Sequence, residues 1–425
     1  MADTKYGQYI YPLLYIEGYS GAAPTVGRHV PMSVNKNVFE HATHHIEIFD
    51  IVRPGTTAVP GQVTVSDGPS EASRFFGRDE KKGDKRVSTG AHYHAYEEMF
   101  LLMGTNPDDP TDLGGEVEIW LGWGPEAEKF VITKPTMILV PEGTVHPPYV
   151  YKRVDRMIKE MVIFSEKYQH YTNFPAPGFP TGYAEEILPW VNKLMKDPKR
   201  IADMEKDKYM SKQAMIEKPY EDPKWDNVQP HFSAPKPLSN TKYGKYVFPL
   251  VYISGYGSAH EMSGRHVPMS VNKNVFPLCS HHVEIFDIVR EGTPHVPGRV
   301  GGASVGGPSV SSMFFGGTAG AGPQPPPLEP GKHVAHYHTN SEMFYFIGTN
   351  PDDPNDLGGE IEIYLGSGIN AEKHVITKPS LVLVPGGVPH TPWVFRKVNR
   401  MMKEIVIQLL PHISHRAYGG WPPGY

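Results

Sequence analysis

Apolar and polar residues alternate in several short stretches of this 425-residue chain. Residues 44–52 contain the run His-Ile-Glu-Ile-Phe-Asp-Ile, and residues 116–121 alternate in the same way. A period of two places successive side chains on opposite faces of a strand. Residues 100–103 and 159–164 have the composition of further short strands. Because Gly- and Pro-rich turns separate these stretches, the pattern predicts an all-β fold of the barrel type.

The whole pattern occurs twice. Residues 27–39 recur without change as residues 264–276, an offset of 237 (264 minus 27). His146 corresponds to His390 at an offset of 244 (390 minus 146), so the second copy carries a net insertion between these points. The insertion falls near residues 316–331, a Gly- and Pro-rich run typical of a loop. The repeat predicts two tandem barrels that arose by duplication.

Four segments follow from this organisation. We expect an N-terminal barrel over residues 1–165, a linker over 166–237, a C-terminal barrel over 238–410 and a tail over 411–425. Within the linker, residues 183–215 carry apolar positions at helical spacing, which Pro198 interrupts, so two helices are predicted. The polar, proline-rich residues 218–238 that follow are typical of an extended connection.

Composition narrows the classes of function. The formal net charge of −5 argues against a nucleic-acid or anionic-membrane surface. Cys279 is the only cysteine, which excludes an intrachain disulfide. The first residues lack a signal-peptide core, and the sequence has no apolar run of about 18 residues. We therefore expect a cytoplasmic protein that acts on a small molecule, binds neither nucleic acid nor membrane, and is compatible with homo-oligomer formation.

Each copy carries three histidines and a glutamate in the same order. Two histidines lie two residues apart on a predicted strand, so both face the same side. A glutamate follows the second histidine by four residues, and a Pro-x-Gly turn precedes the third histidine. Imidazole and carboxylate suit a divalent transition metal and leave positions free for a substrate. The predicted ligands are His92, His94, Glu98 and His146, and His336, His338, Glu342 and His390.

These two motifs resemble those of the cupin superfamily, and their duplication resembles a bicupin of an uncharacterised group. Two positions depart from the family pattern. The glycine after the glutamate comes one residue early, at Gly104 and Gly348, and Val150 and Val394 replace a closing asparagine. None of these changes touches a predicted ligand. The resemblance implies two double-stranded β-helix (jelly-roll) barrels, joined here by the helical linker, with up to two metal ions per chain.

Three classes of function remain open at this stage. The first, which we favour, is a metal-dependent oxygenase of the dioxygenase type that acts on a small organic substrate. An aromatic or phenolic substrate is compatible with this class. The second is an isomerase, lyase or hydrolase that uses the metal as a Lewis acid. The third is a small-molecule-binding bicupin without turnover. Iron is the first expectation for the metal, while manganese, zinc, cobalt, nickel and copper suit the same ligands.

Further histidines precede the metal motif in each copy. His29 and His266 occupy equivalent places, and we expect them to act beside the metal-ligating Glu98 and Glu342 as catalytic groups. A histidine in a pocket serves as a proton shuttle because its pKa lies near neutrality. The alternative is that the histidines of this region cap strands or bridge the two barrels. The sequence does not separate these readings.

Overall fold

The computed structural model describes residues 4–13, 32–34, 44–57, 59, 64–67, 85–88, 91–146, 149–164, 182–199, 238–250, 265–271, 281–292, 334–338, 341–366, 370–408 and 416–419. These residues form antiparallel sheets with one α-helix and short 3-10 turns. The predicted all-β fold class is confirmed. No helix in this part of the chain is long and apolar enough to cross a membrane.

The first copy folds into two sheets that face each other. Its strands are β3 (His45–Ile51), β4 (Gly55–Thr56), β7 (Glu98–Met103), β8 (Gly115–Leu121), β9 (Glu128–Ile132), β10 (Thr136–Val140), β11 (Val150–Val154) and β12 (Ile158–Phe164). The inner sheet contains the order β3-β12-β7-β10, and the outer sheet has the order β4-β11-β8-β9. This alternation of the chain between two four-stranded layers is the jelly-roll topology.

The second copy repeats the topology. Its strands are β15 (His282–Ile288), β16 (Val334–Tyr337), β17 (Glu342–Gly348), β18 (Gly359–Leu365), β19 (Glu372–Ile376), β20 (Ser380–Val384), β21 (His390–Val398), β22 (Met402–Gln408) and β23 (Arg416–Gly419). The inner order β15-β22-β17-β20 matches that of the first copy, and the outer sheet runs β19-β18-β21-β16-β23. A bridge between Gly292 and Phe395 takes the place of β4. The predicted pair of repeated jelly-roll barrels is therefore confirmed at the level of the fold.

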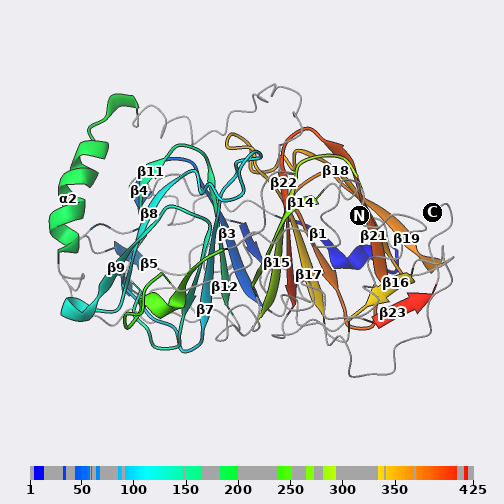
Figure 1. The fold of residues 1–425 in the computed structure, drawn as a ribbon, viewed down its shortest axis with the longest axis horizontal. Coiled ribbons are helices and arrows are strands. Elements are labelled where there is room, and N and C mark those ends of the chain that lie inside the picture. The colour runs from blue at the N-terminus through cyan, green and yellow to red at the C-terminus, as the bar shows by residue number, and fades with distance from the viewer. Residues whose placement is uncertain are drawn as a thin grey trace.

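The two barrels pack through their inner sheets. Figure 1 shows β3 and β12 of the first copy beside β15 and β17 of the second, with the outer sheets turned away from this contact. The buried side chains between the barrels form one cluster that is rich in methionine, isoleucine and leucine, including Met99, Met137, Met161, Ile285 and Ile405. Separate clusters fill the interior of each barrel. The apolar layer between the barrels makes the two copies one structural unit.

A buried ion pair interrupts this apolar layer in each copy. Lys159 Nζ lies 2.5 Å from Asp50 Oδ1, and Lys403 Nζ lies 2.5 Å from Asp287 Oδ1. All four residues are almost completely buried. Lys159 alternates along its strand with Glu160, so it lies on the same face as Met161, which faces the other barrel.

Each inner sheet is completed by a strand from the opposite copy. β1 (Ile10–Pro12) pairs with β20 of the second copy, with Ile10 opposite Val382. β13 (Val247–Pro249) pairs with β10 of the first copy in the equivalent way. In both pairings a strand from one predicted barrel segment joins the sheet of the other. The residue bounds of the four segments stay a prediction. Two short strands, β2 (Met32–Val34) and β14 (Arg265–Val271), extend the inner sheets at their other edges, and β5 (Thr64–Asp67) pairs with β6 (Lys85–Ser88) in a separate ribbon.

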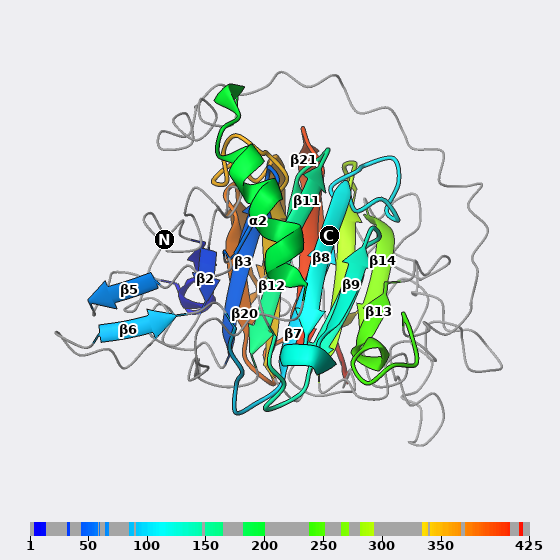
Figure 2. The same cartoon turned by 90° about the vertical axis from the view of Figure 1, so that its left-hand side faces the viewer.

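The predicted linker helix begins as expected. Helix α2 (Tyr183–Leu194) lies across the outer sheet of the first copy, in front of β11 and β8 in Figure 2. Its buried residues Tyr183, Ile187 and Val191 are four apart and pack on Trp120 and Val150. The second predicted helix, after Pro198, extends into residues 200–215, which lie outside the described residues.

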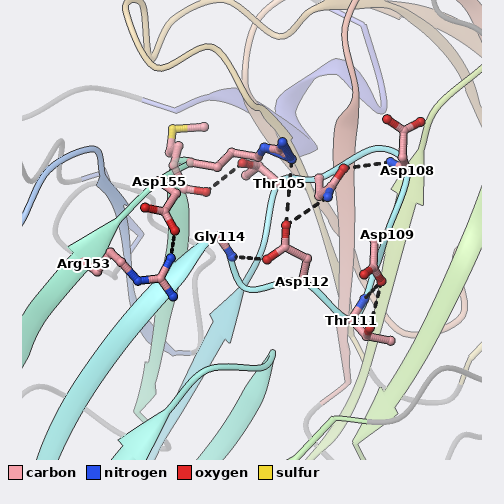
Figure 3. A network of polar contacts seen from close by, with 11 residues as sticks. Thr105, Asp108, Asp109, Thr111, Asp112, Gly114, Arg153 and Asp155 are labelled. Carbon is pink, nitrogen blue, oxygen red and sulfur yellow. Dashed lines mark hydrogen bonds and ion pairs between the residues drawn. The ribbon is translucent and has the colours of Figure 1, made fainter.

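The loop that joins β7 to β8 is held by its own side chains. In Figure 3, Asp112 Oδ1 accepts a hydrogen bond from the Gly114 amide at 2.8 Å, and Oδ2 accepts one from Asn106 Nδ2 at 2.9 Å. Gly114 has a φ of 81°, a left-handed conformation that favours glycine. Asp356 makes the same two bonds in the second copy. These bonds satisfy the loop internally, so its repeated sequence has a structural explanation.

Candidate metal centre

All four predicted ligands of the first copy lie close together. Glu98 is the first residue of β7, and His92 forms a backbone bridge with His146. One potential ligand atom from each of His92, His94, Glu98 and His146 lies within 4.8 Å of the others. Three of the four side chains are buried, and His92 is half-buried. The structure thus brings the predicted set of the first copy together.

The contacts of His146 leave two electron-rich atoms facing each other. Its Nδ1 lies 3.1 Å from the carbonyl oxygen of Thr144, which only accepts hydrogen bonds, so Nδ1 carries the proton of the neutral ring. Its Nε2 then points a lone pair at Glu98 Oε2, only 2.8 Å away. His94 Nε2 lies 3.2 Å from the same oxygen. Such a cluster of acceptors is stable when a cation lies among them, and the residues therefore fit a divalent metal.

Glu98 is ionised in this environment. Its complete burial would raise its pKa, but when His94 and His146 are protonated, their positive charges and their hydrogen bonds to the carboxylate lower the pKa to about 2. An anionic carboxylate beside three imidazoles is the form that binds a metal ion. The same balance of burial against His338 and His390 lowers the pKa of Glu342.

The second copy reproduces the arrangement. Ligand atoms of His338, Glu342 and His390 lie within 4.8 Å of one another, and all three residues are buried. His390 Nδ1 faces the carbonyl oxygen of Val388 at 3.1 Å, and its Nε2 lies 3.0 Å from Glu342 Oε2. The backbone of His336 is opposite that of His390 across β16 and β21, but its side chain lies outside the described part of the structure. Its role as fourth ligand stays a prediction.

The two glutamates differ in what holds their second oxygen. Gln408 Nε2 donates a hydrogen bond to Glu342 Oε1 at 2.8 Å. The residue in the equivalent register beside Glu98 is Phe164, whose ring contacts His94 with 5.2 Å between the centroids. The two clusters therefore share the same kinds of ligand, but the neighbour of the glutamate is polar in the second copy and apolar in the first.

Aromatic side chains cover the third histidine of each cluster. Phe100 lies against both His146 and Tyr149, with centroid distances of 5.8 and 5.0 Å. In the second copy, Trp393 stacks directly on His390 at 6.0 Å and also contacts Phe344. All four aromatic residues are buried in their barrels. They belong to the hydrophobic core of each barrel and pack beside the clusters.

The first barrel contains a further buried acid that the sequence reading missed. Tyr151 donates a hydrogen bond from its hydroxyl to Glu160 Oε2 at 2.6 Å, inside the barrel. Burial of Glu160, with the charges of Glu47 and Glu98, raises its pKa to about 7, although the Tyr151 hydrogen bond acts in the opposite direction. Because Glu160 alternates in phase with Val162 and Phe164, its inward direction could have been found from strand parity.

Of the histidines that precede the metal motif, one equivalent pair lies between the two barrels. His44 Nε2 lies 3.2 Å from His281 Nε2, so this equivalent pair bridges the two barrels. Burial lowers the pKa of His281 to about 4. His29 lies outside the described residues. His266 lies on β14 at a break in the register with β15, and its side chain is also outside the described set. Their catalytic role stays a prediction.

Comparisons with known proteins show similarity in fold at very low identity. No family model matches the sequence, and no curated protein matches it. A mutant oxalate decarboxylase from Bacillus subtilis is 9% identical, with a TM-score of 0.43, over 92% of this chain and 75% of that chain. A Lactobacillus farciminis oxalate decarboxylase in complex with formate is 12% identical, with a TM-score of 0.40, over 96% and 86%. A 7S globulin from Momordica charantia is 9% identical, with a TM-score of 0.42, over 94% and 83%.

Two of these structures are oxalate decarboxylases and the third is a 7S globulin. Sequence identities this low do not support the transfer of a function to this chain.

Proposed function

We propose that the protein is a bicupin metalloenzyme that binds a divalent transition metal in each barrel and acts as an oxygenase on a small organic substrate. The observation that carries the metal sites is the contact between His Nε2 and a glutamate oxygen, at 2.8 Å in the first copy and 3.0 Å in the second. Iron is the first expectation for the metal, and manganese suits the same ligands.

Three imidazoles and one carboxylate leave coordination positions for other molecules. When bound, a redox-active metal supplies electron transfer and a Lewis acid at this point. The chain's own residues hold the ligands in place, since the Thr144 and Val388 carbonyl oxygens fix the tautomers of His146 and His390. Phe100 packs against His146 and Phe344 packs against His390, so each cluster has an apolar ring on one side. Aromatic walls of this kind favour an organic substrate that presents a flat or apolar surface.

Metal content is the direct test of the sites. Elemental analysis of the untreated protein is expected to give up to two transition-metal ions per chain. Glu98→Gln keeps the shape but removes the anionic ligand, so it should weaken the first site only, and Glu342→Gln should weaken only the second. Each variant is the matched control of the other. A protein that binds no transition metal under any loading condition would exclude the proposal.

Oxygen consumption tests the reaction class. Iron-, manganese- and zinc-loaded protein would be assayed with and without air against phenols, diketones and hydroxy acids. Oxygen uptake coupled to loss of a substrate, with iron or manganese but not zinc, is the expected result. Equal turnover without oxygen would exclude an oxygenase and would favour the Lewis-acid class instead.

A further inference from the structure

The inner surface of the first barrel differs from that of the second at two positions on one strand. Tyr149 lies just before β11, and Tyr151 lies within it. Their equivalents in the second copy, at an offset of 244, are Trp393 and Phe395. Both tyrosine rings point into the first barrel, where they are parallel with centroids 6.5 Å apart. The first barrel therefore carries two phenol hydroxyls where the second carries only hydrocarbon and an indole.

The two hydroxyls have different surroundings. That of Tyr151 is bonded to Glu160, as described above. Tyr149 is only 6% exposed, and within the described part of the chain its buried hydroxyl has no hydrogen-bond partner. A buried polar group without a partner destabilises a fold, so it is found where a ligand or another function requires it.

The position of Tyr149 connects this hydroxyl to the metal cluster. Its ring packs on Phe100, which itself packs on His146. Burial raises the pKa of Tyr149, and the negative charges of Glu160 and Glu98 raise it further. Tyr149 therefore stays a neutral donor at physiological pH. In the second copy Trp393 stacks on the equivalent histidine and offers that histidine an apolar ring face.

We propose that the Tyr149 hydroxyl donates a hydrogen bond to an oxyanion of the substrate held at the metal cluster of the first barrel, which makes this barrel the substrate-binding one. The inference rests on the proposed metal sites. The oxyanion is a carboxylate or a phenolate, which share an anionic oxygen that can bind a metal and accept a hydrogen bond. The second cluster has the indole of Trp393 in this place and therefore lacks the hydroxyl donor.

The test measures ligand binding in a full-length protein with only the first cluster intact. In a His338→Ala/His390→Ala background loaded with iron, 4-nitrocatechol binding would be followed by its visible absorption, and oxalate binding by competition. Adding Tyr149→Phe is expected to weaken at least one of these probes about tenfold or more, because a hydrogen bond to a charged group is lost. If only the affinity for 4-nitrocatechol falls, the substrate oxyanion is a phenolate. If only the affinity for oxalate falls, it is a carboxylate.

Tyr345→Phe is the matched control because it removes a different buried phenol hydroxyl, located between the barrels. It should leave both probes within about twofold. Metal content by elemental analysis should not change with Tyr149→Phe, and the thermal midpoint should stay equal or rise, since no internal bond is lost. Unchanged affinity for both probes would overturn the inference, as would a loss of metal or of stability, which would make Tyr149 structural. A background protein that binds no metal would instead refute the proposed function.

Discussion

Glu160 should make the stability of the metal-free protein depend on pH in a predictable direction. Its pKa rises from an ordinary 4.5 to about 7 in the folded barrel, chiefly because of burial. An acid with a raised pKa favours the folded state while it is protonated, so the free energy of unfolding falls as the pH rises from 4.5 through 7. At about 1.4 kcal/mol per pH unit, ionisation of this group alone should lower the free energy of unfolding by about 3 kcal/mol at pH 8.

Glu160→Gln removes the ionisation but keeps the size of the side chain. The variant should match the wild type near pH 4.5 and exceed its free energy of unfolding by about 3 kcal/mol at pH 8. Urea denaturation followed by tryptophan fluorescence, on protein treated with a chelator, would measure the difference between the two proteins at each pH. This difference cancels the titration of the groups that do not interact with Glu160.

Tyr151→Phe provides the opposite perturbation. Its hydroxyl holds the folded-state pKa of Glu160 down, so its loss should leave the start of the decline in stability near pH 4.5 and extend the decline to higher pH. The reasoning would be refuted by a difference between Glu160→Gln and wild type that stays constant from pH 4.5 to pH 8.

Two further predictions concern the contact between the barrels. Lys403→Met leaves the carboxylate of Asp287 buried without its partner, and it should lower the free energy of unfolding by about 3–5 kcal/mol, whereas Lys403→Met with Asp287→Leu should recover most of this loss. Urea denaturation measures both, and a single variant as stable as the wild type would contradict the argument. Deleting residues 1–13 removes β1, so amide hydrogen exchange along β20 should accelerate while the metal content of the first cluster is kept. Unchanged protection of β20 would show that β1 does not stabilise this edge.

Local spacing explains why the barrels and most of the ligands could be predicted. His92 and His94 share a face because they are two residues apart, and the turn before His146 is specified by proline and glycine. The exchange of β1 and β13 could not be predicted in the same way. Both strands follow the same Thr-Lys-Tyr-Gly sequence, and each would fit the edge of either inner sheet. The choice depends on how the two barrels are placed, which no local pattern encodes.

The interior polar groups of the first barrel were missed for a different reason. Glu160 follows a lysine at the start of a short strand, where acidic residues are usually solvated, so composition alone gave no sign of burial. Comparing the copies position by position shows the asymmetry directly, since Phe164 aligns with Gln408 and Tyr149 with Trp393. Repeats thus identify the common framework through their similarities and the specialised copy through their differences.

The reciprocal strands also set an order for the synthesis of this protein. The edge of β10 is completed only after residues 247–249 are made, and β1 finds its partner only after residues 380–384 are made, so Ile10 and Val382 pair across a separation of 372 residues (382 minus 10). Pairings between such distant residues have high contact order and form slowly. Until residues 247–249 are made, the first barrel presents the unpaired edge of β10, and β1 has no partner until β20 is made; such unpaired strand edges recruit other chains. The period before these partner strands are made is therefore when the protein is most exposed to aggregation and most dependent on chaperones.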